Sequence, residues 1–260
     1  MTQKLVPVLS ILALIAACTR PVVVDESHYV HLIYQHAAKT QENADPSMTV
    51  IFIEGDGIPW VAHGTRIASD PTPIHALAYN LYKQTPHAAW YVTRPCYNHV
   101  KDSKCSPKTW TDARYSEEVV SSMVSAVTSN LRSHPSNKLV LVGYSGGGTL
   151  AVLMAPHIPQ VAGVVTIAGN LDIDAWTHLH GYQPLNKSLN PSSFDELTIP
   201  HVAMIGERDT NIPLSSISGY LQSHPHTIVK TIANYDHVCC WEENWPALLD
   251  AALAQMHIVH

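Results

Sequence analysis

The feature that most constrains this chain is an aliphatic run that stops abruptly at a cluster of glycines. Residues 138–142 read Lys-Leu-Val-Leu-Val, and residues 143–147 follow directly as Gly-Tyr-Ser-Gly-Gly. A G-x-S-x-G pattern after a buried strand is typical of a sharp strand-to-helix turn that exposes a serine hydroxyl. The glycines allow the strained turn and the close approach of its neighbours. The pattern therefore predicts that Ser145 is a nucleophile at a strand end.

Two later apolar runs end in residues that can activate a serine. The run 201–205 precedes Asp209, and the run 227–233 precedes His237. A serine hydroxyl needs a histidine to take its proton and a carboxylate to orient that histidine. We therefore expect Ser145, His237 and Asp209 to form a catalytic triad.

These strand ends together resemble the α/β-hydrolases, specifically the bacterial lipoprotein hydrolases of that superfamily. The resemblance rests on the glycine-serine turn at 143–147, the acid loop at 206–213 and the pair Asp236-His237. The chain order Ser, Asp, His is the α/β-hydrolase order. The resemblance covers nearly all of the mature chain. It implies the α/β-hydrolase fold, which is a mostly parallel central sheet with helices on both faces.

Three other acidic residues are alternatives to Asp209. Asp172 and Asp174 follow the run 161–169, and some members of this fold carry the acid one strand earlier. Asp236 directly precedes His237, but a sequence neighbour normally points away from the histidine ring. We favour Asp209 and expect the others to be cap or turn residues.

An oxyanion hole should combine two backbone N–H groups. One belongs to Gly146, the residue after the nucleophile. The other belongs to the loop after the run 49–54, and either Asp56 or Gly57 can supply it. We favour Asp56. No third glycine or phosphate-binding lysine follows this loop, so no nucleotide cofactor is expected.

The remaining chain alternates strand and helix signals, as a doubly wound sheet requires. Strands are expected at 28–35, 50–53, 89–93, 138–142, 161–167, 201–205 and 227–233, and helices at 74–83, 114–132, 147–155, 213–223 and 241–256. The segment 170–197 interrupts the alternation where this fold usually carries its lid. It is too short for a full cap domain, so we expect a short insertion and an open site. Trp176, His180 and Tyr182 are its candidate substrate-binding residues.

Composition fits a single folded enzyme domain. The 260 residues are 46% hydrophobic and 14% charged, which suffices for a sizeable core. The formal charge of -6 makes nucleic acid an unsuitable partner. The nearest approach to a metal motif is His178-x-His180, with Asp172 and Asp174 upstream, and no Cys-His cluster has ligand spacing. We expect neither a metal nor a cofactor, and the oligomeric state is not readable.

The N-terminus resembles a bacterial lipoprotein leader. Residues 1–17 carry Lys4 and then an apolar stretch too short to span a bilayer comfortably, and the segment ends Leu-Ile-Ala-Ala before Cys18. We expect cleavage there, lipidation of Cys18, a flexible tether at 18–27 and the hydrolase domain at 28–260. Thr19 favours the outer membrane, with the domain facing the periplasm. The alternative is an ordinary secretory leader.

Four cysteines remain, an even number that suits an oxidising periplasm. We favour a disulfide between Cys96 and Cys105. Cys239 and Cys240 can form a vicinal disulfide or remain two packed thiols, and packing is favoured.

Two arginines flank the Cys96 region. Arg94 and Arg114 can bind a substrate carboxylate or phosphate. Pairing with Glu117 or Asp112 as surface salt bridges is the favoured interpretation.

The sequence therefore predicts an envelope-anchored serine hydrolase that cleaves carboxylic esters or related acyl compounds through an acyl-enzyme. The alternative is a non-catalytic lipoprotein that kept the fold and binds a partner or an envelope polymer. Specificity for the leaving group and for the acyl length depends on the shape of the pocket, which the sequence does not reveal.

Overall fold

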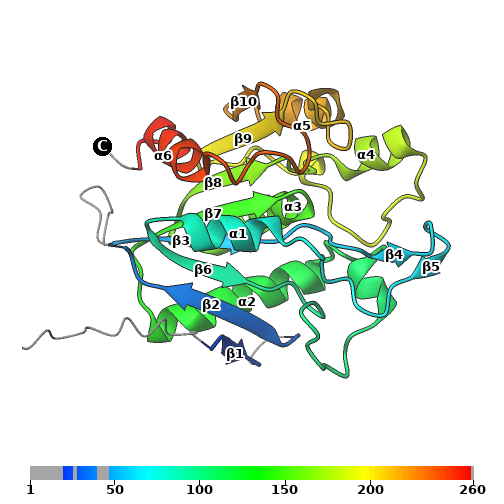
Figure 1. Ribbon diagram of the computed structural model, residues 1–260, viewed down its shortest axis with the longest axis horizontal. Coiled ribbons are helices and arrows are strands. Elements are labelled where there is room, and N and C mark those ends of the chain that lie inside the picture. Colours follow the sequence, from blue (N-terminus) through cyan, green and yellow to red (C-terminus); the bar gives the residue numbers. More distant parts are fainter. Residues whose placement is uncertain (1–19, 26–27, 40–46, 259–260) are drawn as a thin grey trace, which may run out of the picture.

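The computed structural model describes residues 20–25, 28–39 and 47–258 (Figure 1). Its strands are β1 (Val22–Val24), β2 (His31–His36), β3 (Met48–Ile53), β4 (Trp60–Val61), β5 (Arg66–Ile67), β6 (Ala88–Val92), β7 (Lys138–Tyr144), β8 (Val161–Ile167), β9 (His201–Gly206) and β10 (Ile228–Ile232). Its α-helices are α1 (Leu77–Gln84), α2 (Glu117–Ser133), α3 (Gly146–Met154), α4 (Ile173–His180), α5 (Ser218–Ser223) and α6 (Trp245–Gln255).

Eight strands form one twisted sheet in the order β1-β2-β6-β3-β7-β8-β9-β10, and β4 pairs with β5 in a separate ribbon. β2 is antiparallel to both β1 and β6, whereas every pairing from β6 to β10 is parallel. Parallel strands place their carboxyl ends at one edge, where ligands bind in open α/β sheets. The mostly parallel sheet with helices on both faces is the expected α/β-hydrolase fold.

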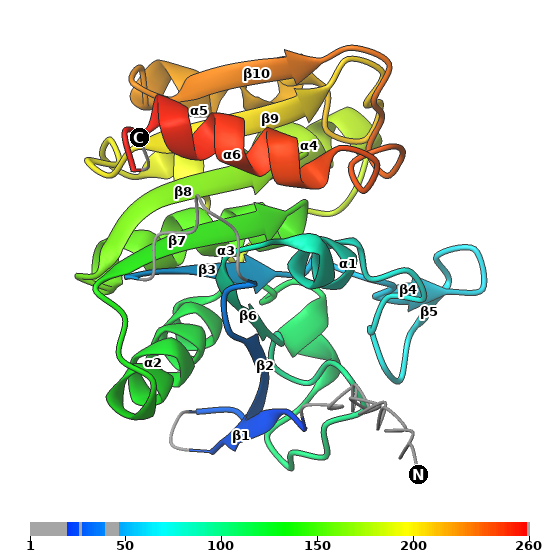
Figure 2. The same cartoon turned by 60° about the vertical axis from the view of Figure 1, so that its left-hand side comes forward.

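Alternation along the strands creates two cores, one on each face of the sheet. In β3, Val50 and Phe52 pack with α1 and α6, whereas Ile51 and Ile53 pack with α2 and α3. Figure 2 shows these helix pairs on opposite sides of the sheet. Each fully buried aliphatic side chain contributes about 1.5–3 kcal/mol, so the central strands are rigid supports for the loops at their ends.

Two segments differ from the sequence predictions. Residues 22–24 were expected in a flexible tether, but these β-branched valines pair with β2 as an edge strand. The sequence predictions place no helix in the insertion after β8, but it contains α4. Asp172 caps that helix by accepting a hydrogen bond from the Ala175 N–H, and Gly181 ends it at φ 64°.

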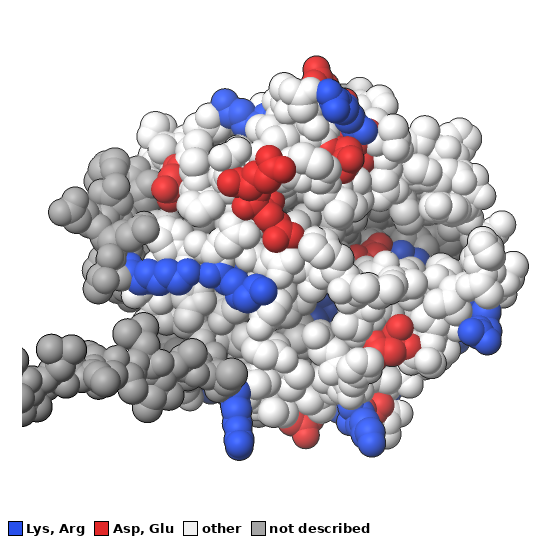
Figure 3. Space-filling view, in the orientation of Figure 1, with Lys and Arg blue, Asp and Glu red and all other residues white. Residues whose placement is uncertain are grey.

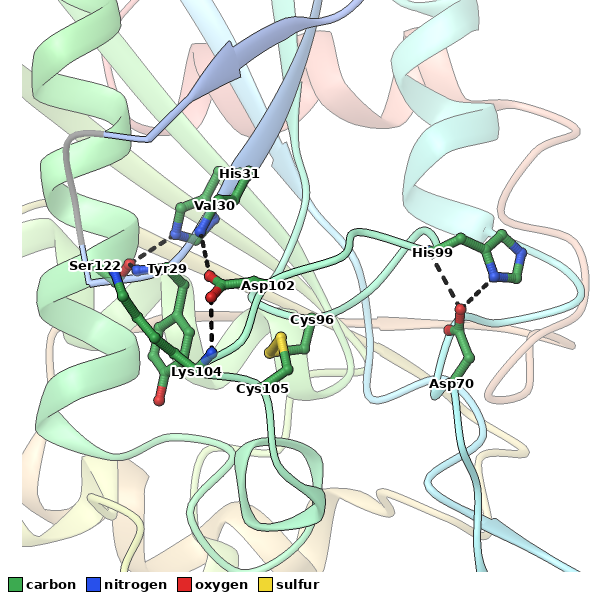
Figure 4. The surroundings of a disulfide bond; sticks show 10 residues. All are labelled: Tyr29, Val30, His31, Asp70, Cys96, His99, Asp102, Lys104, Cys105 and Ser122. Atoms are coloured by element: carbon green, nitrogen blue, oxygen red, sulfur yellow. Dashed lines mark hydrogen bonds and ion pairs between the residues drawn. A yellow bond between two sulfur atoms is a disulfide. The ribbon is translucent and has the colours of Figure 1, made fainter.

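The expected disulfide between Cys96 and Cys105 is present, with a Cα–Cα distance of 5.6 Å. Figure 4 shows Asp102 inside this loop, where its carboxylate accepts hydrogen bonds from the N–H groups of Val30 (3.0 Å) and Lys104 (2.9 Å). The disulfide loop is thus tied to the start of β2.

The predicted leader, residues 1–17, and the predicted lipidation site Cys18 lie outside the residues that the structure describes. Within the described part of the chain, no helix has the length and apolar character needed to cross a membrane.

Candidate active site

Ser145 sits at the junction of β7 and α3, in a strained backbone conformation with φ 50° and ψ −119°. The surrounding backbone is closely packed. A Cβ atom at Gly143 would lie 2.2 Å from the Gly147 carbonyl oxygen, and one at Gly147 would lie 2.2 Å from the Ile53 carbonyl oxygen. Only glycine fits at these two positions, which explains the glycine pattern around the serine.

Ser145, His237 and Asp209 lie in hydrogen-bond contact, although the sequence separates them widely. The Ser145 hydroxyl is 3.1 Å from Nε2 of His237. Nδ1 of the same ring is 2.9 Å from Oδ2 of Asp209, whose side chain is fully buried. The other oxygen, Oδ1, accepts hydrogen bonds from the N–H groups of Asn211 and Ile212, each at 2.8 Å. The backbone thereby fixes the carboxylate against the ring.

The alternative acids have other partners. Asp172 caps α4, and both Asp172 and Asp174 accept hydrogen bonds from the Asn190 amide. Asp236 accepts from the N–H groups that follow His237 in the chain. The structure therefore brings Asp209, and not these residues, to the histidine.

A second charged cluster surrounds Asp56, which follows β3. Its carboxylate accepts hydrogen bonds from Arg94 Nη1 (2.6 Å), Arg114 Nη1 (2.9 Å) and the Tyr115 hydroxyl (2.6 Å). Both arginines are almost fully buried. The expectation that they form surface salt bridges was wrong, because both side chains are buried and bind the carboxylate of Asp56, which precedes them in the chain.

The Asp56 cluster is held in a defined charge state. Burial alone would raise the pKa of Asp56, but the Arg114 and Arg94 guanidinium groups and the Tyr115 hydroxyl hold it well below its ordinary value. The carboxylate is therefore ionised at neutral pH. With two guanidinium groups and one carboxylate, the cluster carries a net positive charge.

This cluster lies directly beside the predicted oxyanion hole. A Cβ atom at Gly146 would be 2.1 Å from Oδ1 of Asp56, so the carboxylate touches the start of α3. The Tyr97 hydroxyl donates to the Asp56 carbonyl oxygen at 2.9 Å. Among the hydrogen bonds of the described residues, none is donated by the backbone N–H of Asp56, Gly57 or Gly146. These N–H groups remain available to a ligand, and the choice between Asp56 and Gly57 stays a prediction.

Glu54 and Tyr144 are two buried ionisable residues next to the turn that carries Ser145. Glu54 is buried and accepts hydrogen bonds from the N–H groups of Gly55 and of Ala78 and Tyr79 in α1. Burial raises the pKa of Glu54, and these hydrogen bonds partly offset the rise. The Tyr144 ring lies 5.3 Å from the His237 ring, and burial is also the main cause of the raised pKa of Tyr144.

The predicted substrate-binding residues gather at the end of α4. Trp176, His180 and Tyr182 have ring centroids within 5.7 Å of one another, and half of the Tyr182 surface is exposed. Trp176 and His180 both contact Asn211, a residue that sequence reasoning did not select. Asn211 also contacts His237. The position of Asn211, two residues after Asp209 in the acid loop, was the sequence signal that could have identified it as a site residue.

Cys239 and Cys240 are joined as a vicinal disulfide, so the favoured interpretation as two packed thiols was wrong. The pair follows His237 closely in the chain, and the Cys239 N–H donates to Asp236. The disulfide therefore belongs to the loop that carries the histidine.

Figure 3 shows a hollow between the β4–β5 ribbon and α4, with acidic and basic atoms at its floor. It opens at the carboxyl ends of the parallel strands. A separate cavity of about 790 Å³ lies between α2 and residues 186–189, and none of the triad residues lines it. Within the described residues, no three His, Cys, Asp or Glu side chains are grouped as metal ligands would be.

Comparison of the sequence with known protein families gives a match to the dienelactone hydrolase family over residues 75–237. This range contains Ser145, Asp209 and His237. Comparison with curated proteins gives no match.

Solved structures show the same fold at low sequence identity. A proline iminopeptidase from Mycobacterium smegmatis has a TM-score of 0.65 and 12% identity, covering 92% of this chain and 99% of that one. Est1E from Butyrivibrio proteoclasticus, solved with ferulic acid, has a TM-score of 0.65 and 10% identity, covering 91% and 99%. A lidless serine hydrolase from Xanthomonas campestris has a TM-score of 0.57 and 9% identity, covering 90% and 93%. Because the family match spans more than half of the chain, the protein belongs to the dienelactone hydrolase family and is a hydrolase with the α/β-hydrolase fold.

Proposed function

We propose that this protein hydrolyses carboxylic esters, with Ser145 as nucleophile, His237 as general base and then acid, and Asp209 as the orienting carboxylate. One observation carries the proposal. An unbroken series of hydrogen bonds runs from the buried Asp209 carboxylate through His237 to the hydroxyl of Ser145, at a strained turn. This is the arrangement that converts a serine hydroxyl into a nucleophile.

The proposed reaction uses these three residues in turn. The Ser145 oxygen attacks the ester carbonyl carbon while His237 Nε2 takes the hydroxyl proton. The tetrahedral oxyanion accepts hydrogen bonds from the N–H groups of Gly146 and Asp56. Collapse of this intermediate expels the alcohol oxygen, which receives the proton from Nε2, and leaves an acyl group on Ser145. Water, deprotonated by the same nitrogen, then releases the acid.

The charge around Asp56 supports its place in the oxyanion hole. A lone carboxylate touching Gly146 would oppose the development of negative charge nearby. Arg94 and Arg114 reverse that effect because the cluster is cationic overall. They also fix the loop whose N–H group must meet the oxyanion.

Carboxylic esters are the substrates that the site supports best. The insertion after β8 holds one short α-helix and one 3-10 turn, and Ser145 at the carboxyl end of β7 is partly exposed, so an ester can reach its hydroxyl. Among the structural neighbours is an esterase from Pyrococcus furiosus, with a TM-score of 0.62. Trp176, His180 and Tyr182 are the proposed substrate contacts. Thioesters, lipids and small peptides would use the same machinery.

The expected location belongs to the proposal as well. Lipidation of Cys18 would anchor the domain in the bacterial envelope, facing the periplasm. Thr19 after Cys18 favours the outer membrane as the site of the anchor. Radioactive palmitate incorporation, compared between the wild type and Cys18→Ala, tests this claim separately from activity. Equal incorporation would contradict it.

Hydrolysis of p-nitrophenyl esters from acetate to palmitate tests the catalytic proposal. Wild type should turn over at least one chain length, and Ser145→Ala should lose at least about a thousandfold of that rate. A folded wild type without turnover on the entire series would favour the non-catalytic alternative.

A further inference from the structure

Asn211 uses every polar group that it has, and each one faces the active site or α4. Its backbone N–H donates to Asp209 Oδ1 at 2.8 Å, and its carbonyl oxygen accepts from His180 Nε2 at 2.8 Å. The side-chain oxygen accepts from the Trp176 indole N–H at 3.2 Å. The side-chain nitrogen lies 3.0 Å from His237 Nε2. Asn211 thus touches both the acid and the base of the triad.

The chemistry of the partners fixes how the Asn211 amide is turned. An indole N–H can only donate, so the amide oxygen must face Trp176 and the NH₂ group must face His237. The carboxylate of Asp209 can only accept, so the neutral His237 ring carries its proton on Nδ1. Nε2 therefore holds the lone pair, which both the Ser145 hydroxyl and the Asn211 NH₂ group approach.

We propose that Asn211 is a positioning residue for His237 and that Trp176 sets the orientation of its amide. The inference rests on the proposed function. In the resting enzyme, the amide holds the ring so that Nε2 faces the Ser145 hydroxyl. When the O–H bond of Ser145 breaks and the Nε2–H bond forms, two N–H groups face each other, which disfavours the protonated ring. The proton then passes to the leaving oxygen, and Asn211 neither gains nor loses a proton.

The other groups around His237 do not supply this effect. Asp209 faces Nδ1, on the opposite side of the ring. The N–H groups of Cys239 and Val238 lower the pKa of Asp236 and hold its carboxylate against the backbone. Tyr144 is buried with a raised pKa and is neutral. His180 reaches the region only through the Asn211 carbonyl oxygen.

Three variants test the proposal in the full chain. Asn211→Ala keeps the backbone hydrogen bond to Asp209 but removes the amide, and it should lower kcat about tenfold to a hundredfold with KM within about twofold. The acid limb of the kcat/KM profile should move to higher pH, because the protonated ring is no longer opposed. Asn211→Asp should move it further. Trp176→Phe keeps the ring packing but frees the amide, and it should give a smaller shift in the same direction.

Asn190→Ala is the matched control. Asn190 also supports α4 through its side chain, accepting from Ile173 N–H and donating to Asp172, but it has no contact with His237. It should lower thermal stability without moving the acid limb. An equal shift in Asn190→Ala would show that any loosening of α4 suffices, and the proposal would be overturned.

A measurement that needs no turnover separates this proposal from the proposed function. The ¹⁵N shift of His237 Nε2 in the neutral ring, measured by NMR, should differ between Asn211→Ala and wild type, because the Asn211 NH₂ group no longer donates to that nitrogen. If the wild type is inactive but this difference is still seen, the proposed hydrolase mechanism is contradicted and the positioning role of Asn211 is supported. Unchanged kcat, acid limb and ¹⁵N shift in Asn211→Ala would overturn the positioning role itself.

Discussion

Replacing Asp56 by asparagine should destabilise the protein far more than its chemical similarity suggests. The change keeps the size of the side chain but removes the charge that two buried guanidinium groups share. Hydrogen bonds of 2.6, 2.9 and 2.6 Å converge on the carboxylate, and an amide presents one NH₂ group to donors that require acceptors. Breaking a buried ion pair from one side costs about 3–5 kcal/mol, because the remaining charge stays buried.

For a chain of this size, that loss should lower Tm by roughly 6–20 °C. Differential scanning calorimetry at pH 7 measures it, with Asp70→Asn as the control. Asp70 also contacts a basic side chain, but that partner, His99, is 85% exposed, and an ion pair at such a site is worth at most about 1 kcal/mol. If Asp56→Asn lowers Tm no more than Asp70→Asn does, the reasoning about a buried charge cluster is refuted.

The pH dependence of the unfolding free energy, compared between wild type and Asp56→Asn, gives a second test. The pKa of Asp56 is lower in the folded protein than in the unfolded chain, so its stabilisation is present above about pH 4 and is lost as the pH falls through the folded value. The difference in unfolding free energy between wild type and Asp56→Asn should therefore shrink below pH 4. A difference that stays constant from pH 7 to pH 3 would mean that the carboxylate charge is not responsible.

Further predictions follow from single contacts. Asp209→Asn should lower kcat about ten-thousandfold with the fold intact, whereas Asp172→Asn should stay within about fivefold, as ester hydrolysis would show; equal losses would contradict the assignment of the acid. Replacing both Cys96 and Cys105 by serine should cost about 2–3 kcal/mol in urea unfolding through lost loop closure, and no change would mean that the disulfide does not form. Glu54→Gln should gain stability relative to wild type as the pH rises above about 4.3, because the raised folded pKa of Glu54 makes wild type lose stability there; a constant difference up to pH 8 would contradict burial as the cause.

The sequence was sufficient for the central sheet because its strands are continuous aliphatic runs. The runs at 138–142 and 161–167 lie inside β7 and β8, and the G-x-S-x-G pattern fixed the turn between β7 and α3. Strands that are buried on both faces leave this signal in the sequence. The edge strand β1 has only three residues beside the predicted leader, so local pattern could not distinguish it from a tether.

The helix α4 was missed even though its boundaries carry signals. Asp172 before the helix and Gly181 after it are typical cap residues. The prolines and asparagines of the insertion do not fit a regular helix pattern, so no helix was predicted there. Greater weight on the two cap residues than on composition would have predicted it.

The hydrogen-bonded arrangement of Ser145, His237 and Asp209 could be predicted, but its surroundings could not. Ser145, Asp209 and His237 each end a recognisable strand signal, so their spacing along the chain was informative. The partners of Asp56 lie 38 to 59 residues away on separate loops, and no local pattern marks a carboxylate that two buried arginines will bind. The same holds for Asn211, whose contacts with Trp176 and His180 depend on where α4 packs.

The central claim is that Ser145 is an activated nucleophile. Fluorophosphonate labelling of the leaderless domain, read by intact mass and peptide mapping, tests it most directly. We expect a single adduct on Ser145, no adduct in Ser145→Ala and strongly slowed labelling in Asp209→Asn. A folded wild type that takes no label, or that takes it on another residue, would contradict the account.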